Sequence, residues 1–211
     1  MARKIVKYLL LVLIVGLLAY NSVYIKKLSE VQTKEAAAFD AASFAEKRWV
    51  TQLPARLDSA VALDVLQSTI KTNPAFAFQN WFNSISIGNI RYGLVKVNGK
   101  VLSVNEDDVT ILAGNATDPL TLTITTEYVY GNAIRDAARL VDINDFVNTT
   151  DLNNVSEEVN KLVRKRVLPA FKAQVKKADS ISCTGAIELN QAHYSLNELE
   201  IIPVQCKIIQ Q

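Results

Sequence analysis

The stretch YVYGNAIRDAARLVDINDFVN, residues 128–148, places an arginine directly before an aspartate, Arg135 and Asp136, close to several amides. A planar guanidinium, a carboxylate and amide groups hydrogen-bond the hydroxyls of a sugar in fixed directions. A ligand site here would combine Arg135 and Asp136 with Gly131, Asn132, Asn144 and Asn148. The glycine would let the backbone turn sharply and approach a bound molecule closely.

The same pair has a second interpretation, as a structural clamp. Side chains of neighbouring residues point in different directions, so Arg135 could bind loose carbonyls or a distant carboxylate while Asp136 caps a turn. Losing one partner of a buried ion pair costs about 3–5 kcal/mol, so a fold could depend on this pair without any ligand. Buried polar clusters in small domains more often have this structural role, but the sequence leaves both interpretations open.

Few other residues suit catalysis or metal binding. His193 is the single histidine, and the sequence contains no nucleophile elbow, zinc-protease motif, P-loop or dinucleotide-binding motif. The acidic stretch DINDFVNTTD lacks the glycine and the final glutamate of an EF-hand loop. We therefore expect no metal, no cofactor and no enzymatic activity. Hydrolysis by two carboxylates that meet in space is the remaining catalytic alternative.

Cys183 and Cys206 each lie in a strand-like run near the end of the chain. A hairpin in the simplest register places Cys183 opposite Cys206 and Gly185 opposite Val204. A non-hydrogen-bonded antiparallel pair brings the Cα atoms close enough for a disulfide. The alternatives are this disulfide, which fits an oxidising compartment, and two buried thiols that do not pair.

The N-terminal segment predicts export from the cytoplasm. A basic start, MARKIVK, leads into an apolar run from Ile5 to Ile25, which as a helix would span about 30 Å, the thickness of a bilayer core. The positive-inside rule places the N-terminus in the cytoplasm and the body outside. Residues 1–25 are therefore predicted to be a single transmembrane anchor in the bacterial inner membrane. A cleaved signal peptide, with a soluble periplasmic body, is the alternative, although Ala19-Tyr20-Asn21 fits a cleavage site poorly.

The rest of the chain is predicted to contain a linker, residues 26–38, and one periplasmic domain, residues 39–211. The chain of 211 residues is 49% hydrophobic and 21% charged, values typical of globular proteins. Its net charge is +2, and basic residues gather at the N-terminus, so the body is close to neutral. This excludes nucleic acid as a partner, because binding it requires a surplus of Lys and Arg.

The elements of the body follow a recognisable order. Helices are expected first, and from about residue 85 the patterns predict three strands, one helix and two strands. Asn98-Gly99 predicts a type I′ hairpin turn, and Asn154 with Glu157 predicts the start of a helix that runs to Leu168. Asn73-Pro74 predicts the start of an earlier helix. We therefore predict an α+β, mainly β fold: an OB-like β-barrel with a helical N-terminal portion, behind the anchor.

The motif G-x-A-I-R-D-A, followed by N-D-F-x-N, closely resembles a motif of the domain-of-unknown-function 2291 family of predicted periplasmic lipoproteins. FDAASFAEKRW, VKVNGKV, RVLPAF and TGAIEL follow in the family's order, over about residues 39–208. The resemblance implies an OB-like barrel, single or duplicated, and a periplasmic location. The chain departs from the family by lacking a lipid-accepting cysteine near the N-terminus and by having Thr149 where glutamine is usual.

Genes of this family often lie beside those of sugar ABC transporters, which implies an accessory role in carbohydrate uptake. We expect a non-enzymatic binding module that presents a small polar ligand near a transporter or its solute-binding protein. The alternatives are a scaffold that contacts those proteins without a small-molecule site, and a carboxylate-dependent hydrolase. A concave pocket containing Arg135 would favour the first function, and an exposed apolar patch with Arg135 bonded internally would favour the second. Two carboxylates about 5–10 Å apart in a cleft would favour the third.

Overall fold

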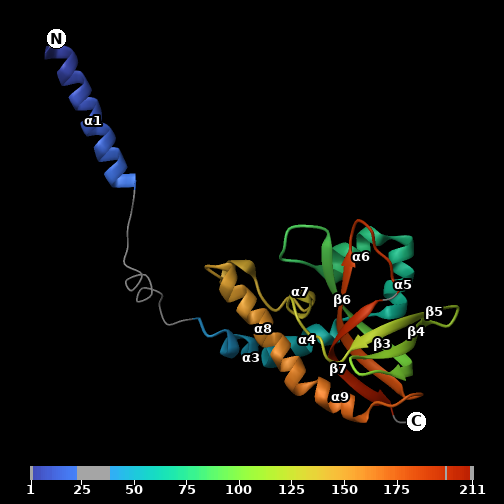
Figure 1. Ribbon diagram of the computed structural model, residues 1–211. Helices are drawn as coiled ribbons and strands as arrows, with labels where there is room; N and C mark the ends of the chain where they lie inside the picture. Colours follow the sequence, from blue (N-terminus) through green and yellow to red (C-terminus); the bar gives the residue numbers. More distant parts are fainter. Residues whose placement is uncertain (1, 23–38, 198, 210–211) are drawn as a thin grey trace. The chain divides into compact units, whose positions relative to one another are not determined.

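The computed structural model describes residues 2–22, 39–197 and 199–209 (Figure 1). Its contacts divide the chain into two units, residues 1–39 and 40–211. Both clusters of buried apolar side chains lie between Ala41 and Val204, and the partly buried residues packed on them extend to Ile208. The second unit therefore contains the whole described core, and a fragment of residues 26–211 retains it.

Helix α1, Ala2–Ser22, forms where the apolar N-terminal run was expected. Its large apolar side chains between Ile5 and Leu18 are exposed. Among the described residues, no helix combines the length and the apolar character that crossing a membrane requires. The predicted transmembrane helix is therefore not found. Residues 23–25 of that prediction, and the predicted linker at residues 26–38, lie outside the described residues.

The described strands form one mixed, seven-stranded sheet, and no second sheet that would indicate a duplicated fold is present in this part of the chain. The strands are β1 (Val61–Ala62), β2 (Phe82–Asn83), β3 (Ile90–Val104), β4 (Asp108–Asn115), β5 (Asp118–Thr125), β6 (Ser180–Asn190) and β7 (Glu200–Ile209). The five long strands pair in the closed order β3–β4–β5–β7–β6–β3, in which only the β5–β7 pairing is parallel. This is the order of strands in an OB fold, as the sequence predicts.

In chain order the helices form two sets, one before β3 and one between β5 and β6 (Figure 1). Before β3 lie α3 (Ala41–Thr51), α4 (Leu53–Asp58), α5 (Leu63–Thr72) and α6 (Pro74–Trp81). Between β5 and β6 lie α7 (Ala133–Ala137), a 3-10 turn (Ile143–Asp145), α8 (Thr149–Arg166) and α9 (Leu168–Gln174). Successive residues of a strand pack into two different hydrophobic cores, as expected for a sheet covered on both faces. For example, Val95 packs in the cluster with α5 and α6, whereas Leu94 packs in the cluster with α3, α7 and α8.

The hairpin predicted at Asn98-Gly99 is wrong. Strand β3 continues through both residues, and Gly99 pairs with Ile181 of β6 on one side and Ala113 of β4 on the other. A Cβ atom at Gly99 would lie 2.9 Å from the Leu112 carbonyl oxygen. The glycine therefore allows neighbouring strands to approach closely, and pairing on both sides prevails over the local turn preference.

The start predicted for the long helix is also wrong, because α8 begins at Thr149. Asn148 caps it: its Oδ1 accepts the Asp151 N–H at 2.8 Å, and its Nδ2 donates to Asp151 Oδ2 at 2.8 Å. The backbone bond is an N-cap and the side-chain bond reinforces it, so the helix starts before Asn154 and leaves that residue in its interior. The prediction at Asn73 is confirmed, since its Oδ1 accepts the Phe76 N–H at 3.1 Å.

The last two strands pair with Cys183 opposite Cys206, as predicted, and the two form a disulfide with Cα atoms 4.1 Å apart. The register then shifts, so Gly185 lies opposite Pro203 and the predicted partner Val204 is wrong. Val204 is the extra residue of a β-bulge. Proline has no N–H to donate, and it is tolerated beside a bulge, as Pro203 is here. A strict two-residue period cannot reveal such an insertion.

Gly185→Ala is expected to destabilise the domain. An added Cβ would lie 2.5 Å from both Ile201 Cγ2 and the Ile202 carbonyl oxygen, so the strands would have to separate at the bulge. Overpacking of this kind lowers the free energy of unfolding by about 1–3 kcal/mol. Urea unfolding of the 26–211 fragment measures the loss, and an unchanged midpoint would contradict the close approach.

Candidate functional site

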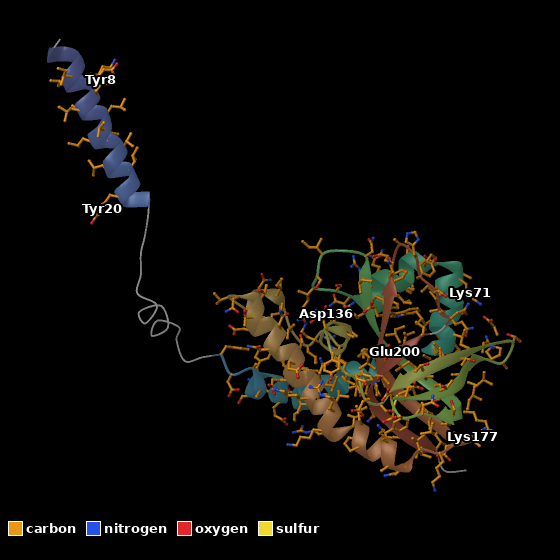
Figure 2. All side chains as sticks on the ribbon, in the orientation of Figure 1. Tyr8, Tyr20, Lys71, Asp136, Lys177 and Glu200 are labelled. Atoms are coloured by element: carbon orange, nitrogen blue, oxygen red, sulfur yellow. A yellow bond between two sulfur atoms is a disulfide. The ribbon has the colours of Figure 1, made fainter. Side chains whose placement is uncertain are left out.

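Arg135 and Asp136 lie on α7 and are almost completely buried, with 2% and 0% of their surface exposed. Figure 2 labels Asp136 on this short helix. The chain enters α7 through Gly131, whose φ of +76° favours glycine. Arg135 Nε donates to Asp136 Oδ1 at 2.7 Å, so the two neighbours form a buried ion pair.

Each member of the pair also bonds a different part of the fold. Arg135 Nη1 donates to Ser156 Oγ on α8 at 2.8 Å, and to a carbonyl oxygen of the same helix at 3.4 Å. Asp136 Oδ2 accepts the Ile85 N–H at 3.2 Å, and its carbonyl oxygen accepts Asn83 Nδ2 at 3.1 Å. The pair therefore joins α7 to α8 and to the segment between β2 and β3, which is the geometry of a clamp.

Two buried polar residues of α8 that sequence reasoning missed complete this network. Ser156 Oγ donates to Asn132 Oδ1 at 3.2 Å, and Asn160 Nδ2 donates to the Gly131 carbonyl oxygen at 2.9 Å. Their spacing in the sequence could have revealed them. Ser156 and Asn160 lie four residues apart, and each directly follows a valine on the buried face of α8. Polar residues at that spacing beside the buried face indicate a partner inside the fold.

The remaining residues of the predicted ligand site do not converge on this network. Asn144 is exposed, and both its N–H and its Nδ2 bond Asp142 Oδ1, at 2.9 and 2.8 Å. Asn148 is the cap of α8. The structure therefore brings together Arg135, Asp136 and Asn132, with Gly131 joining through its carbonyl group, and places Asn144 and Asn148 elsewhere.

The negative charge of Asp136 affects the pKa of a neighbouring residue, Tyr92. Burial raises the pKa of Tyr92, and the negative charges of Glu188 and Asp136 raise it further. Tyr92 lies opposite Glu188 in the β3–β6 pairing. Its hydroxyl therefore stays protonated at neutral pH and can act only as a neutral hydrogen-bonding group.

Four well-defined cavities lie on the described part of the chain, and neither Arg135 nor Asp136 lines any of these four. The largest of the four, about 700 Å³, lies between α9 and β7. An adjoining hollow of about 390 Å³ extends it toward α3 and α4. We call the two together the β7 groove, since both are lined by Arg166, Val167, Val204 and Gln205.

The edge of β7 along this groove has unpaired backbone groups. β7 pairs with β5 only at Glu200 and Ile201, so no described strand lies beside the rest of that edge. The short Cα distance between Cys183 and Cys206 is that of a non-hydrogen-bonded pair, so the N–H and C=O of Cys206 point away from β6. The same holds for Ile208, two residues on. Within the described ranges, these groups have no hydrogen-bond partner.

Comparison with protein families gives an independent result. The family model described as "Predicted periplasmic lipoprotein (DUF2291)" matches residues 13–207. The chain belongs to this family. The resemblance that the sequence motif indicates is thereby confirmed, and the family's description agrees with the predicted periplasmic location.

Solved structures place this DUF2291 chain among OB folds. One similar structure is an OB-fold protein from Thermotoga maritima, with 20% sequence identity and a TM-score of 0.71. The alignment covers 82% of this chain and 99% of that protein. The predicted OB-like class is therefore confirmed at the level of the fold. No curated protein matches the chain.

The first part of the DUF2291 motif, residues 131–137, thus contains the buried network, in which Arg135 and Asp136 are closed to external molecules. Each of these four cavities is lined by at most one carboxylate, but the two that form the β7 groove together contribute Asp179 and Asp58. The described residues contain no cluster of three metal-ligating side chains. One further hollow, of about 390 Å³, is lined by Gln67, Lys71, Asp118 and Tyr194 among others. Hydrogen bonds from Lys71 and Gln67 hold the pKa of Asp118 below its ordinary value, so its carboxylate is charged at neutral pH.

Proposed function

We propose that this DUF2291 chain is a non-enzymatic accessory module of sugar uptake, which works by binding a protein partner in the periplasm. The partner is a sugar ABC transporter or its solute-binding protein, as the family resemblance implies. The observation that carries the proposal is the open edge of β7 beside the β7 groove. The internal bonding of Arg135 supports it, because a clamped arginine is not free for a sugar.

The β7 groove suits an extended segment of the partner. An extended segment that adds to a strand edge gains backbone hydrogen bonds there and specificity from neighbouring side chains. Val167, Ala170 and Phe171 provide an apolar wall. Lys176 and Lys207 are exposed, and neither forms an ion pair within the described residues. We infer that the bound segment is acidic, since charge complementarity sets register and specificity.

We also propose that α1 holds the module at the inner membrane, with the body in the periplasm. The support is the exposed apolar surface of α1 and the basic residues in its first two turns. Removal of α1 as a signal peptide, with a soluble body, is the alternative. Alkaline extraction of membranes and N-terminal sequencing of the mature protein distinguish them, because an anchored chain stays in the pellet with its first residues.

Ile208→Pro is expected to abolish partner binding without unfolding the domain. The substitution removes an N–H that points to the open edge, where proline is tolerated. A photocrosslinker at Gln205, in membranes of the native host, should capture the transporter or its solute-binding protein, and Ile208→Pro should remove the product. Lys207→Pro is the matched control, since its N–H bonds β6 and its loss should lower stability instead. Capture that persists in Ile208→Pro would contradict binding at the edge.

A second candidate function, presentation of a small polar ligand, is favoured by the hollow of Gln67, Lys71, Asp118 and Tyr194. It combines an aromatic ring with an amide, an ammonium and a carboxylate, which are groups that bind sugars. A sugar at about 100 times its dissociation constant would stabilise the 26–211 fragment by about 2.7 kcal/mol. A panel of sugars in a thermal unfolding assay, repeated with Asp118→Asn, therefore tests this candidate. Hydrolysis has less support, since the two carboxylates of the β7 groove, Asp179 and Asp58, line its two separate hollows.

A further inference from the structure

A small hollow of about 190 Å³ lies where the ends of α4, α6 and α7 meet. Its polar lining comes from five residues, namely Arg56, Ser59, Asn80, Trp81 and Arg139, and we call it the arginine hollow. The rest of the lining is apolar and comes from Ala60, Val61, Leu94 and Ala137. No aspartate or glutamate is among its lining residues, so the charged side chains of its wall are both positive.

Both arginines have donors left for a ligand. Arg56 is exposed, and its guanidinium has no hydrogen bond or ion pair with any residue that the structure describes. Arg139 Nη2 donates to the carbonyl oxygens of Phe82 and Asn80, at 3.3 and 3.5 Å. These bonds hold the Arg139 guanidinium in place and use only one of its nitrogen atoms. Within the described residues, the hollow therefore offers one guanidinium without an internal bond, that of Arg56, and one held by two carbonyl groups, that of Arg139.

The backbone at Arg139 is unusual. Its φ is +49°, in the left-handed region that residues with a side chain rarely adopt. The turn is closed by backbone bonds from the Arg139 N–H to the Asp136 carbonyl at 3.1 Å and from the Leu140 N–H to the Arg135 carbonyl at 3.0 Å. These two bonds form a Schellman motif, in which the residue after the helix cap adopts the left-handed conformation, so the positive φ of Arg139 marks the end of α7. Here the buried Arg135–Asp136 pair fixes the helix that presents Arg139.

We propose that the arginine hollow binds the phosphate group of a small molecule or of a lipid headgroup. A phosphate monoester carries nearly two negative charges and the phosphodiester of a lipid headgroup carries one. Guanidinium groups complement both, because each planar guanidinium can bind two phosphate oxygens at once. The hydroxyl of Ser59 and the amide of Asn80 add polar groups to the wall, and Trp81 adds an aromatic side chain. The volume is below the roughly 300–1,000 Å³ of sites for drug-sized ligands, so it suits one anionic group with its body outside.

The test is titration calorimetry of the 26–211 fragment with glucose phosphate, with glucose and with inorganic phosphate, at low ionic strength. A second arm pellets the fragment with vesicles of phosphatidylglycerol or of phosphatidylcholine. We expect binding of glucose phosphate without binding of glucose, and weaker binding as salt is added, because exposed charges are screened. Binding to phosphatidylglycerol vesicles alone would assign the phosphate to a lipid.

Variants separate this site from general attraction of anions. Arg56→Gln should weaken phosphate binding by about tenfold or more, which corresponds to about 1.4 kcal/mol. Arg91→Gln is the control, because it removes one positive charge outside the hollow. Like Arg139, Arg91 bonds carbonyl oxygens, at 2.8 and 2.9 Å. Arg139→Lys keeps the positive charge but removes the planar guanidinium group. Its affinity for phosphate should therefore lie between that of the parent and that of Arg56→Gln. Failure of every phosphate probe to bind, or equal losses in Arg56→Gln and Arg91→Gln, would overturn the proposal.

Discussion

Arg135→Met is expected to lower the free energy of unfolding of the 26–211 fragment by about 3–5 kcal/mol. Methionine fills much of the volume of the arginine side chain. The decrease in the free energy of unfolding would therefore come from the missing charge and hydrogen bonds, and not from a cavity. The substitution leaves the carboxylate of Asp136, 0% exposed, without its cation, and Ser156 without the guanidinium it accepts from. An uncompensated buried charge is among the most destabilising changes that one residue can produce.

The double variant Arg135→Met with Asp136→Asn distinguishes a clamp from other causes. Asparagine keeps an oxygen that can accept the Ile85 N–H, which Asp136 Oδ2 accepts at 3.2 Å, but removes the orphaned charge. Because removing both members of a buried pair is often nearly neutral, the double variant should recover a large part of the loss. Urea unfolding of both variants provides the comparison. If Arg135→Met were as stable as the parent, the clamp would be refuted, and a double variant as unstable as the single one would argue against charge as the cause.

This expectation changes how the family motif is interpreted. A motif with an arginine, an aspartate and a glycine resembles a binding site in sequence, because the same groups bind polar ligands and buried backbone. Burial decides between the two uses, since a guanidinium enclosed by α8 cannot reach a solute. The motif therefore indicates the fold of the family, and its functional consequence is indirect, through the placement of Arg139.

Much of the fold could be predicted because its signals are local. The run EIIPVQCKII coincides with β7, Glu200–Ile209, and the order of strands and helices led to the OB class. The failures occur where a long-range contact overrides a local preference. Gly99 has turn chemistry but is paired on both sides, and the bulge at Val204 inserts a residue that no periodic pattern contains.

The functional surfaces were harder to predict, for a related reason. Arg135 and Asp136 are neighbours in sequence and could be noticed together, but their partners on α8 and before β3 are distant in the chain. Arg56 and Arg139 belong to no motif and meet only because α4 and α7 end at the same hollow. The open edge of β7 depends on where the pairing with β5 stops, which the sequence does not specify.

Replacing both cysteines, Cys183→Ser with Cys206→Ser, is expected to lower the free energy of unfolding by about 3 kcal/mol. The bond closes a loop with a sequence separation of 23, and the chain-entropy model gives about this value for a loop of that size. The effect should be concentrated in β7, because beyond Ile201 that strand is paired only with β6. Amide hydrogen exchange should therefore accelerate first in the residues after Pro203.

The same substitution tests whether the bond forms in the periplasm. A reductant should lower the melting temperature of the parent protein and leave that of the double variant unchanged. Non-reducing mass mapping of the mature protein should recover the two cysteines in one linked peptide pair. Two free thiols in the mature protein, or a parent that is insensitive to reductant, would contradict this. Since Cys206 lines the β7 groove, loss of the bond should also weaken partner binding, because an edge that frays cannot hold an added strand.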